Sequence, residues 1–294
     1  MSFFERIENG WELVKRSLKA LREDKEIILF PILSIIFVVL LTIVFVVLAI
    51  GQGIVSAFIE PGFNQDISAA IFGLTFLVYL LAVYFVTTFF KSAIITSATI
   101  RFDGKNPSFG DGLKTPAKHI LRIFFWSLIL LLVNIIVNAI RNAGKSKSRG
   151  IQIGTSAAAS AVETAWKLLM YFTLPILLFE ELSIWQSMKK STELFKKTWG
   201  ENILAQFTIG GIFFLIGIIA AIPAALIFLI GFFTGAVVLI PVAIVWLVIE
   251  IAIFSVIQTS VDGILIAALY SYATSGKVPK VLEGGMAQKL FAKK

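Results

Sequence analysis

Long apolar runs, separated by short polar segments, dominate the pattern of the chain. Six runs cover approximately residues 27–50, 67–100, 120–140, 161–179, 203–233 and 237–272. A helix needs about 20 apolar residues to cross a bilayer. The second and sixth runs exceed this length, so we expect their helices to tilt or protrude. The pattern predicts an all-α, polytopic membrane bundle of six transmembrane helices.

The polar segments carry lysine and arginine in alternate connections, which predicts the orientation of the chain. The first and fifth connections, residues 51–66 and 234–235, contain neither residue type. Basic residues are in excess on the cytoplasmic side of membrane proteins, so we expect a multi-pass protein of the cell membrane with both termini in the cytoplasm. The basic residues concerned are Arg6, Lys15, Arg16, Lys19, Arg22, Lys25, Arg101, Lys105, Lys114, Lys118, Lys189, Lys190, Lys196, Lys197, Lys277, Lys280, Lys289, Lys293 and Lys294.

One connection disagrees with this orientation. Arg141, Lys145, Lys147 and Arg149 fall between the third and fourth runs, on the predicted outer side. Either the charge rule is violated once, or these two runs form a hairpin that does not fully cross the membrane. The other connections favour six spans.

Two pairs of segments repeat at nearly equal spacing, which indicates an internal repeat. One pair, 174 residues apart, is Gly10-Trp11 with Lys15-Arg16-Ser17 and Ile184-Trp185 with Lys189-Lys190-Ser191. The other pair, 172 residues apart, is Gly104-Lys105-Asn106-Pro107 and Gly276-Lys277-Val278-Pro279. We therefore expect one membrane domain, 1–294, built of units at about 1–107, 108–179 and 180–279. Each unit has a basic amphipathic helix and a helical hairpin, and the first and third end at a glycine that can adopt the left-handed conformation.

Composition supports the membrane class and excludes several kinds of site. The chain is 58% hydrophobic and 15% charged, with no cysteine and one histidine, His119. Disulfides, thiolate chemistry and two-histidine metal sites are thereby excluded, and no motif for a cofactor or catalytic group is present. The net charge is +8, and the basic residues cluster beside the spans. We therefore expect anionic lipid headgroups, not nucleic acid, as their partner.

Several stretches of the chain resemble a known family. They are Trp166 with Pro175-Ile176-Leu177-Leu178-Phe179-Glu180, Ser191 with Phe195-Lys196-Lys197-Thr198-Trp199-Gly200-Glu201, Ala267-Ala268-Leu269-Tyr270-Ser271-Tyr272-Ala273 with Gly276, and the N-terminal Phe4-Glu5-Arg6 with Gly10-Trp11. The chain resembles an uncharacterised family of six-helix prokaryotic membrane proteins, similar in layout to the membrane domain fused to some glycerophosphodiester phosphodiesterases. The resemblance covers nearly the whole chain and is weakest across 141–160. It implies a six-helix membrane fold and no particular activity, so we expect no phosphodiesterase chemistry.

The basic amphipathic segments are the first candidate surface. Trp185, Met188, Thr192, Phe195 and Trp199 recur at spacings of three and four, while lysines take much of the other side. Such helices lie in the membrane interface with tryptophan at headgroup level. They either only orient the bundle or bind anionic lipid or a protein partner, which includes a second copy of the chain. The candidate residues are Lys15, Arg16, Lys189, Lys190, Lys196 and Lys197.

Ionisable residues inside the spans form a second candidate site. They are Lys91 in the second span, and Glu250 and Asp262 in the sixth, with Gln258 on the same half of the helix as Glu250 and Asp262. Charged groups at such depth usually face a partner or water. The repeat aligns Lys91 with the residue next to Asp262, so the two side chains should lie at similar depth in the membrane. We therefore hypothesise an ion pair between them. Alternatively, Asp262 faces a water-filled vestibule and Lys91 extends to the interface.

The polar faces around these residues could line a conduit or simply join helices by hydrogen bonds. Joining helices is also the interpretation for the stripe formed by Asn134, Asn138 and Arg141. Glu180 closes the fourth span, and we expect it to hold Lys189 or Lys190 and fix the turn there.

Two functions follow from these candidates. The first is a non-catalytic scaffold or accessory subunit that engages lipid or a protein partner through its basic helices. The second is a small solute or ion transporter or channel that uses Lys91, Glu250 and Asp262. We expect no enzyme, because no nucleophile with a base and no metal-ligand set is present.

Overall fold

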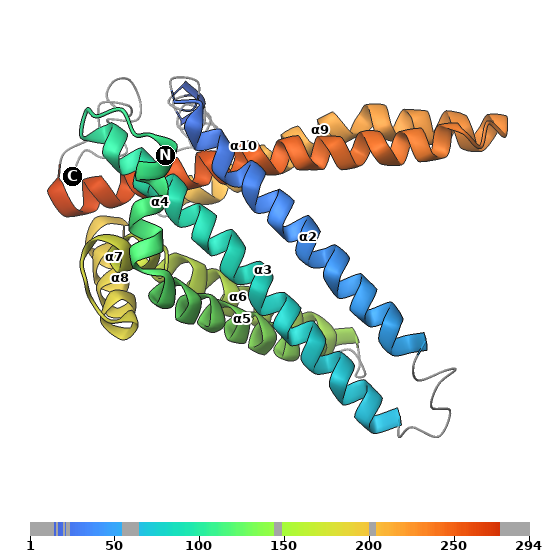
Figure 1. Cartoon of the computed structure of the whole chain (residues 1–294), viewed down its shortest axis with the longest axis horizontal. Coiled ribbons are helices and arrows are strands. Elements are labelled where there is room, and N and C mark those ends of the chain that lie inside the picture. The colour runs from blue at the N-terminus through green and yellow to red at the C-terminus, as the bar shows by residue number, and fades with distance from the viewer. Residues whose placement is uncertain are drawn as a thin grey trace. The chain divides into compact units, whose positions relative to one another are not determined.

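The computed structural model describes residues 15, 17–19, 21, 24–54, 65–143, 149–199 and 204–276. Within these ranges the chain forms α-helices and no strand, which confirms the all-α prediction. The helices are α2 (Glu26–Ile54), α3 (Gln65–Phe102), α4 (Phe109–Lys118), α5 (Ile120–Asn142), α6 (Arg149–Leu169), α7 (Thr173–Phe179), α8 (Ile184–Trp199), α9 (Leu204–Thr234) and α10 (Leu239–Ser275) (Figure 1).

Six helical stretches are long and apolar enough to cross a membrane. They are Glu26–Ile54, Asp66–Phe102, Ile120–Asn142, Ile151–Phe179, Ile216–Thr234 and Leu239–Ser275. Apolar side chains along them are widely exposed, for example Val47, Leu74 and Val248. Large exposed apolar surfaces of this kind are stable against lipid and not against water. The chain is therefore a multi-pass membrane protein, as predicted.

The fourth stretch differs from its prediction in its start and its continuity. It was expected as one run over 161–179, whereas α6 begins at Arg149 and ends at Leu169, and α7 follows after a short break. Pro175 explains the break, because proline lacks an N–H group and its ring clashes with the carbonyl four residues earlier, here that of Tyr171. The early start reflects a polar, alanine-rich segment that an apolar-run search does not detect.

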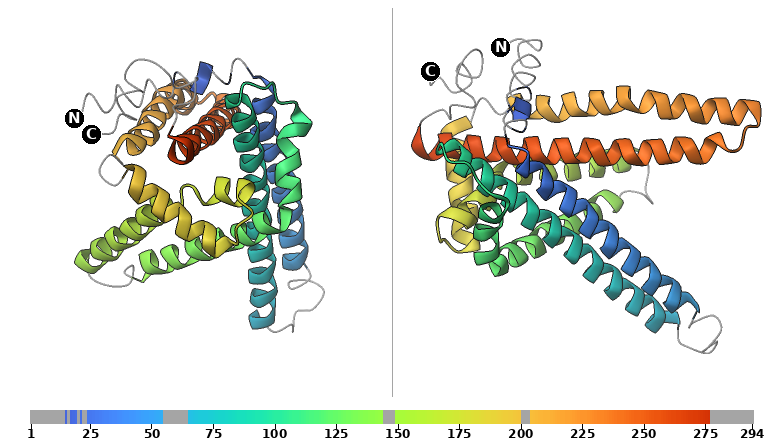
Figure 2. Two further views of the ribbon diagram at one scale, coloured as in Figure 1. Left: turned by 90° about the vertical axis from the view of Figure 1, so that its left-hand side faces the viewer. Right: turned by 45° about the horizontal axis from the view of Figure 1, so that its top comes forward.

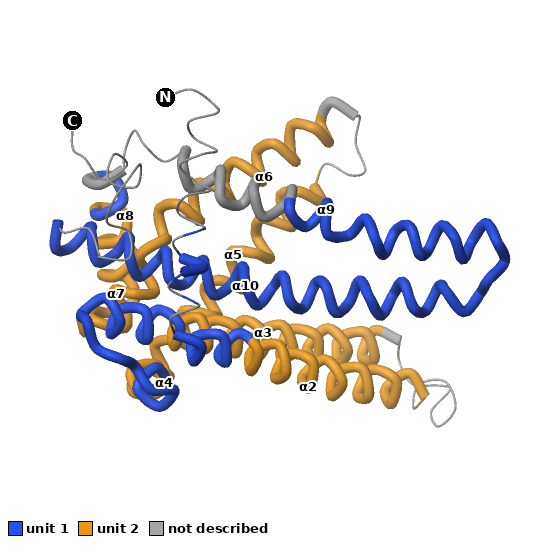
Figure 3. The backbone as a smooth tube through the Cα atoms, turned by 90° about the horizontal axis from the view of Figure 1, so that it is seen from above, with its two compact units in different colours: residues 1–31, 94–112, 194–294 blue, residues 32–93, 113–193 orange. Residues whose placement is uncertain are grey.

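The chain divides into two compact units (Figure 3). Unit 1 comprises residues 1–31, 94–112 and 194–294, and unit 2 comprises residues 32–93 and 113–193. The expectation of one membrane domain with three repeat units stays a prediction.

In unit 1, α9 and α10 pack as an antiparallel pair joined by a tight turn (Figure 2). A Cβ at Gly231 would lie only 2.9 Å from the Cβ of Leu239, so glycine permits the helices to approach near the turn. The C-terminal part of α3 also packs closely against α10, since a Cβ at Gly263 would lie 2.5 Å from Cγ2 of Ile94.

In unit 2, two helix pairs are held by aromatic contacts. Phe45 of α2 stacks on Tyr79 of α3, with ring centroids 4.6 Å apart, and Thr42 shares a 3.0 Å hydrogen bond with the same tyrosine. Trp126 of α5 stacks on Trp166 of α6 at 6.3 Å. Stacked aromatic pairs add roughly 0.5–1.5 kcal/mol beyond the area they bury.

The ends of α3 and α10 confirm the predicted glycine stops. Gly104 has φ +79° and Gly276 has φ +69°, both left-handed. The N–H of Gly104 bonds to the carbonyl of Arg101, and that of Lys105 to the carbonyl of Ile100, which is the complete Schellman arrangement. The segments buried ahead of the two stops, centred on 88–98 and 260–270, are also 172 residues apart.

Candidate functional site

Helix α8 presents two contrasting faces. Ser187, Ser191 and Phe195 recur every four residues and are buried. Trp185, which is 75% exposed, shares the opposite face with the exposed Lys189 and Lys196, because spacings of four and seven return to one side of a helix. Trp185 and Phe195 therefore do not belong to one apolar surface, although their spacing alone suggested it.

A single hydroxyl attaches α8 to the break in the fourth span. Ser191 Oγ donates a 2.7 Å hydrogen bond to the carbonyl of Leu169 and accepts a 3.0 Å bond from the N–H of Phe172. Backbone groups freed by a helix break within a membrane must find such partners. The serine thus satisfies both sides of the interruption at once.

An ion pair fixes the turn that leads into α8. Lys190 Nζ pairs with the carboxylate of Glu180, and both side chains are partly buried. Of the two lysines expected as partners of Glu180, Lys190 is therefore the one that the structure pairs with it. Adjacent Lys189 lies on the exposed face instead.

The starts of α4 and α8 share a feature that the sequence analysis missed. The Ser183 hydroxyl accepts a bond from the N–H of Gln186, whose side-chain oxygen accepts one from the N–H of Ser183. Ser108 and Asp111 are bonded in the same way ahead of α4. These are capping boxes, with the Ser-x-x-Gln/Asp spacing that the sequence displays.

The N-terminal candidates are described in part. Lys15 is exposed, and Ser17 and Leu21 are buried. Arg16 lies outside the described residues, and so does the side chain of Lys197.

The intramembrane candidates lie in separate units. Lys91 of α3 is half-buried in unit 2, whereas Glu250 and Asp262 of α10 are half-buried in unit 1 and Gln258 is exposed there. The predicted ion pair between Lys91 and Asp262 stays a prediction. Glu250 Oε2 is buried, and it has no hydrogen-bond partner among the described residues.

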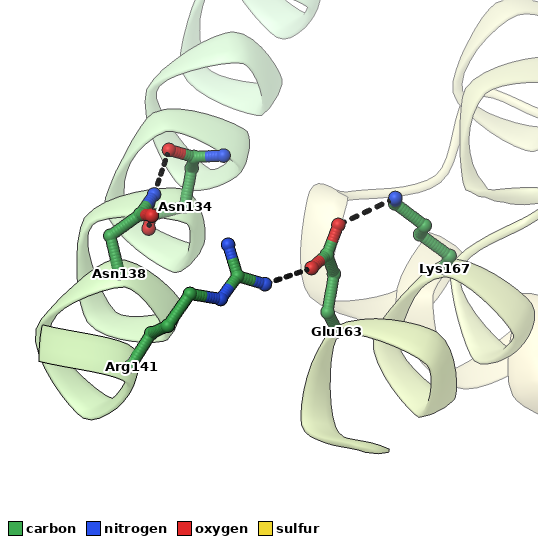
Figure 4. A network of polar contacts seen from close by, with 5 residues as sticks. All are labelled: Asn134, Asn138, Arg141, Glu163 and Lys167. Atoms are coloured by element: carbon green, nitrogen blue, oxygen red, sulfur yellow. Dashed lines mark hydrogen bonds and ion pairs between the residues drawn. The ribbon is translucent and has the colours of Figure 1, made fainter. Parts of the chain in front are cut away.

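A polar network joins α5 to α6 (Figure 4). Arg141 Nη2 donates a 2.9 Å bond to Glu163 Oε2, and Lys167 Nζ donates a 2.6 Å bond to Glu163 Oε1. Asn138 Nδ2 bonds to the carbonyl and side-chain oxygens of Asn134. The stripe expected to join helices does so through Arg141 alone, since its two asparagines bond within α5.

Glu163 and Lys167 were absent from the predicted sites. Their signal is a Glu and a Lys four residues apart inside an expected span, a spacing that places them on one helix face.

The other end of α5 also gathers charge. Lys118 Nζ lies 3.4 Å from Glu181 Oε1, and Arg122 reaches the backbone carbonyl of the same residue at 3.5 Å. His119, between them, is buried. Burial lowers the pKa of His119, and the nearby charges of Arg122 and Lys118 lower it further, while Glu181 raises it.

In unit 1, Asp24 precedes the start of α2 and is buried. Burial raises the pKa of the Asp24 carboxyl, although bonds from the N–H groups of Glu26 and Ile27 and the charge of Arg101 act in the opposite direction.

Most of the chain matches a known protein family. Residues 69–280, from the first turns of α3 to beyond α10, match the family of unknown function DUF6159. The chain belongs to that family. No curated protein matches the chain. The similarity in layout to the phosphodiesterase-linked membrane domain stays a resemblance.

The described part of this family member offers no group of three or more His, Asp or Glu side chains that could hold a metal ion. The structure instead gathers charged side chains on the exposed face of α8 and in the clusters at the two ends of α5.

Proposed function

We propose that this chain is a non-catalytic scaffold or accessory subunit of the cell membrane. Its basic helices lie on the cytoplasmic side, where both termini also lie, and engage anionic lipid headgroups or a protein partner. The observation that carries this proposal is the exposed face of α8, which combines Trp185 with Lys189 and Lys196.

The chemistry of this face suits the membrane interface. Tryptophan prefers headgroup level, and each lysine near an anionic surface contributes about 1 kcal/mol. The opposite face is tied to the spans through Ser191 and through the Lys190–Glu180 pair. The two lysines on the exposed face are thereby held toward lipid or a partner.

The N-terminal segment supports a second surface of the same kind. Lys15, Ser17 and Leu21 lie 174 residues before Lys189, Ser191 and Phe195, and each is exposed or buried like its counterpart. This agreement favours the proposed repeat and a shared orientation of the two basic helices.

Native mass spectrometry of the solubilised protein with phosphatidylglycerol tests the lipid arm. We expect the double variant K189Q/K196Q to retain less of this lipid than the wild type. E193Q is the matched control, because it alters an exposed residue of α8 in the opposite charge sense, so it should retain more. Equal retention by all three proteins would contradict the lipid arm, and loss of a co-purified protein in K189Q/K196Q would then favour the partner arm.

A second candidate function, solute or ion transport, is favoured by Glu250. A buried carboxylate oxygen without a described partner inside a span is typical of ion pathways. Proteoliposomes loaded with dyes that report the tested ion, including a pH-sensitive dye for protons, test it: a flux in the wild type that E250Q abolishes supports transport. Absence of flux in the wild type across monovalent and divalent ions contradicts it.

A further inference from the structure

The network at the end of α5 has an unbalanced charge. Arg141 and Lys167 share the single carboxylate of Glu163, one oxygen each, which leaves one net positive charge. The side chains are 39%, 71% and 33% exposed in the order Arg141, Lys167, Glu163. Among the described residues, neither Arg141 nor Lys167 forms an ion pair with a second carboxylate.

The length of α5 places the network at a defined depth. Arg122 and Arg141 lie nineteen residues apart on this helix, which corresponds to about 28 Å at a rise of 1.5 Å per residue. The hydrocarbon core of a bilayer is roughly 30 Å thick. With Arg122 at one interface, Arg141 reaches the other, at the level where lipid phosphates lie.

The donors around this charge are not all used. Arg141 bonds through Nη2, while its Nη1 and Nε make no hydrogen bond within the part of the chain that the structure describes. Asn134 lies about two turns deeper on α5, and its Nδ2 likewise makes no bond to a described residue. Figure 4 shows Arg141 and Lys167 on either side of Glu163.

We propose that the cluster of Arg141, Glu163 and Lys167 binds the phosphate group of an anionic phospholipid at the membrane face opposite His119. The guanidinium and ammonium groups donate to the phosphate oxygens, as they do in charge-assisted pairs generally. The deeper Asn134 amide donates to an ester carbonyl of the same lipid, which favours a lipid over a soluble phosphate. The site does not depend on the lysines of α8.

A purely structural role for the network makes a different prediction. If Glu163 only pins α5 to α6, its neutralisation weakens the fold and leaves lipid binding unchanged or reduced. If the cluster binds phosphate, the carboxylate competes with the ligand for both cations, and its neutralisation strengthens binding. E163Q and K167Q therefore change lipid retention in opposite directions only in a binding site.

The experiment uses the full chain carrying K189Q/K196Q, so that lipid bound at α8 does not contribute. Native mass spectrometry measures retained phosphatidylglycerol, with phosphatidylcholine and glycerol phosphate as comparison probes. We expect K167Q to weaken phosphatidylglycerol retention about tenfold, E163Q to strengthen it, and K105Q, the same change at an exposed lysine outside the cluster, to leave it unchanged.

Lys167 is largely exposed, so K167Q is expected to fold, and circular dichroism of each variant checks this. Unchanged retention in K167Q would overturn the proposal, as would a loss in E163Q equal to that in K167Q. Binding of glycerol phosphate as strongly as phosphatidylglycerol would overturn the assignment to a lipid.

Discussion

Ser187 and Ser191 are both fully buried on the same face of α8, but their hydroxyls bond differently. Ser187 donates to the carbonyl of Ser183, the residue that directly precedes α8. Ser191 instead bridges Leu169 and Phe172 across the break between α6 and α7. The two serines are equally buried, but we expect them to contribute unequally to the stability of the fold.

We expect S191A to lower the free energy of unfolding by about 1–3 kcal/mol, because it removes the hydrogen bonds that the serine makes to the Leu169 carbonyl and the Phe172 N–H at the helix break. S187A should cost less, since the carbonyl that it releases keeps its helical bond. Denaturation of the detergent-solubilised protein, followed by far-ultraviolet circular dichroism, measures both. Equal losses in the two variants would show that the bridge contributes no more than burial does.

His119 should make stability depend on pH. Its pKa in the folded chain lies below the ordinary value of about 6.5, because burial and the charges of Arg122 and Lys118 disfavour its protonated form. The unfolded chain therefore binds more protons as pH falls through this window, and stability decreases with it.

We expect the wild type to lose more stability than H119Q between pH 7.5 and pH 5. The difference between the two proteins isolates the histidine, because Asp24, whose pKa is raised, contributes a slope of opposite sign to both. Unfolding midpoints at the two pH values provide the measurement. Parallel slopes for wild type and H119Q would contradict the assigned cause.

The sequence could identify charged residues but not their partners. Lys189 and Lys190 are chemically identical neighbours, and only the path of the chain around Glu180 decides which one pairs with it. In the sequence, Glu163 lies inside an apolar stretch, and only the fold brings Arg141 beside it. Pairing over 22 residues depends on helix packing, which periodicity does not encode.

At the scale of elements, the glycines that end α3 and α10 offer a direct test. A Cβ at Gly104 or Gly276 would meet no atom within 4 Å, so substitution strains the left-handed backbone alone. We expect G104A and G276A each to cost about 1–2 kcal/mol. G154A is the control: this glycine lies inside α6 with open space around it, and alanine should stabilise it by about 0.5–1 kcal/mol.

Thermal unfolding of the three variants compares them directly. A stabilising G104A would mean that the end of α3 does not need the left-handed conformation.

Helix existence was predictable because apolar runs of this length have few alternatives to spanning a membrane. The start of α6 was not, because its alanine, serine and threonine residues are only weakly apolar. Its end was signalled by Pro175, but tolerance of proline in membrane helices leaves a kink and a break equally open. The structure shows a break, and the hydroxyl of Ser191, which belongs to a different helix, accepts a hydrogen bond from a backbone N–H group there.

For the whole molecule, the repeat remains a prediction that burial now favours. The buried segments 88–98 and 260–270 and the glycine stops that follow them keep the same spacing of 172 residues. The ion pair proposed between Lys91 and Asp262 rests on that equivalence. The equal spacing places the two residues at similar depth, and pairing requires in addition that the two helices face each other.

Orientation can be measured directly because the chain has no cysteine, so each introduced thiol is unique. We expect V237C, at the exposed turn between α9 and α10, to react with a membrane-impermeant maleimide on intact cells. E193C on α8 should react only after permeabilisation. Labelling of E193C from outside would reverse the proposed cytoplasmic face.

Labelling of N142C tests whether the connection after α5 lies on the outer side of the membrane. If spans three and four formed a hairpin that stopped within the bilayer, Arg141 would lie in hydrocarbon, where a charged side chain costs at least about 2.5 kcal/mol. Full crossing places it at the interface instead, with Glu163 and Lys167 beside it. We therefore expect N142C to be labelled from outside like V237C, despite the four basic residues there. Labelling of N142C only after permeabilisation would mean that α5 does not cross, and the phosphate site would then lose the depth on which it rests.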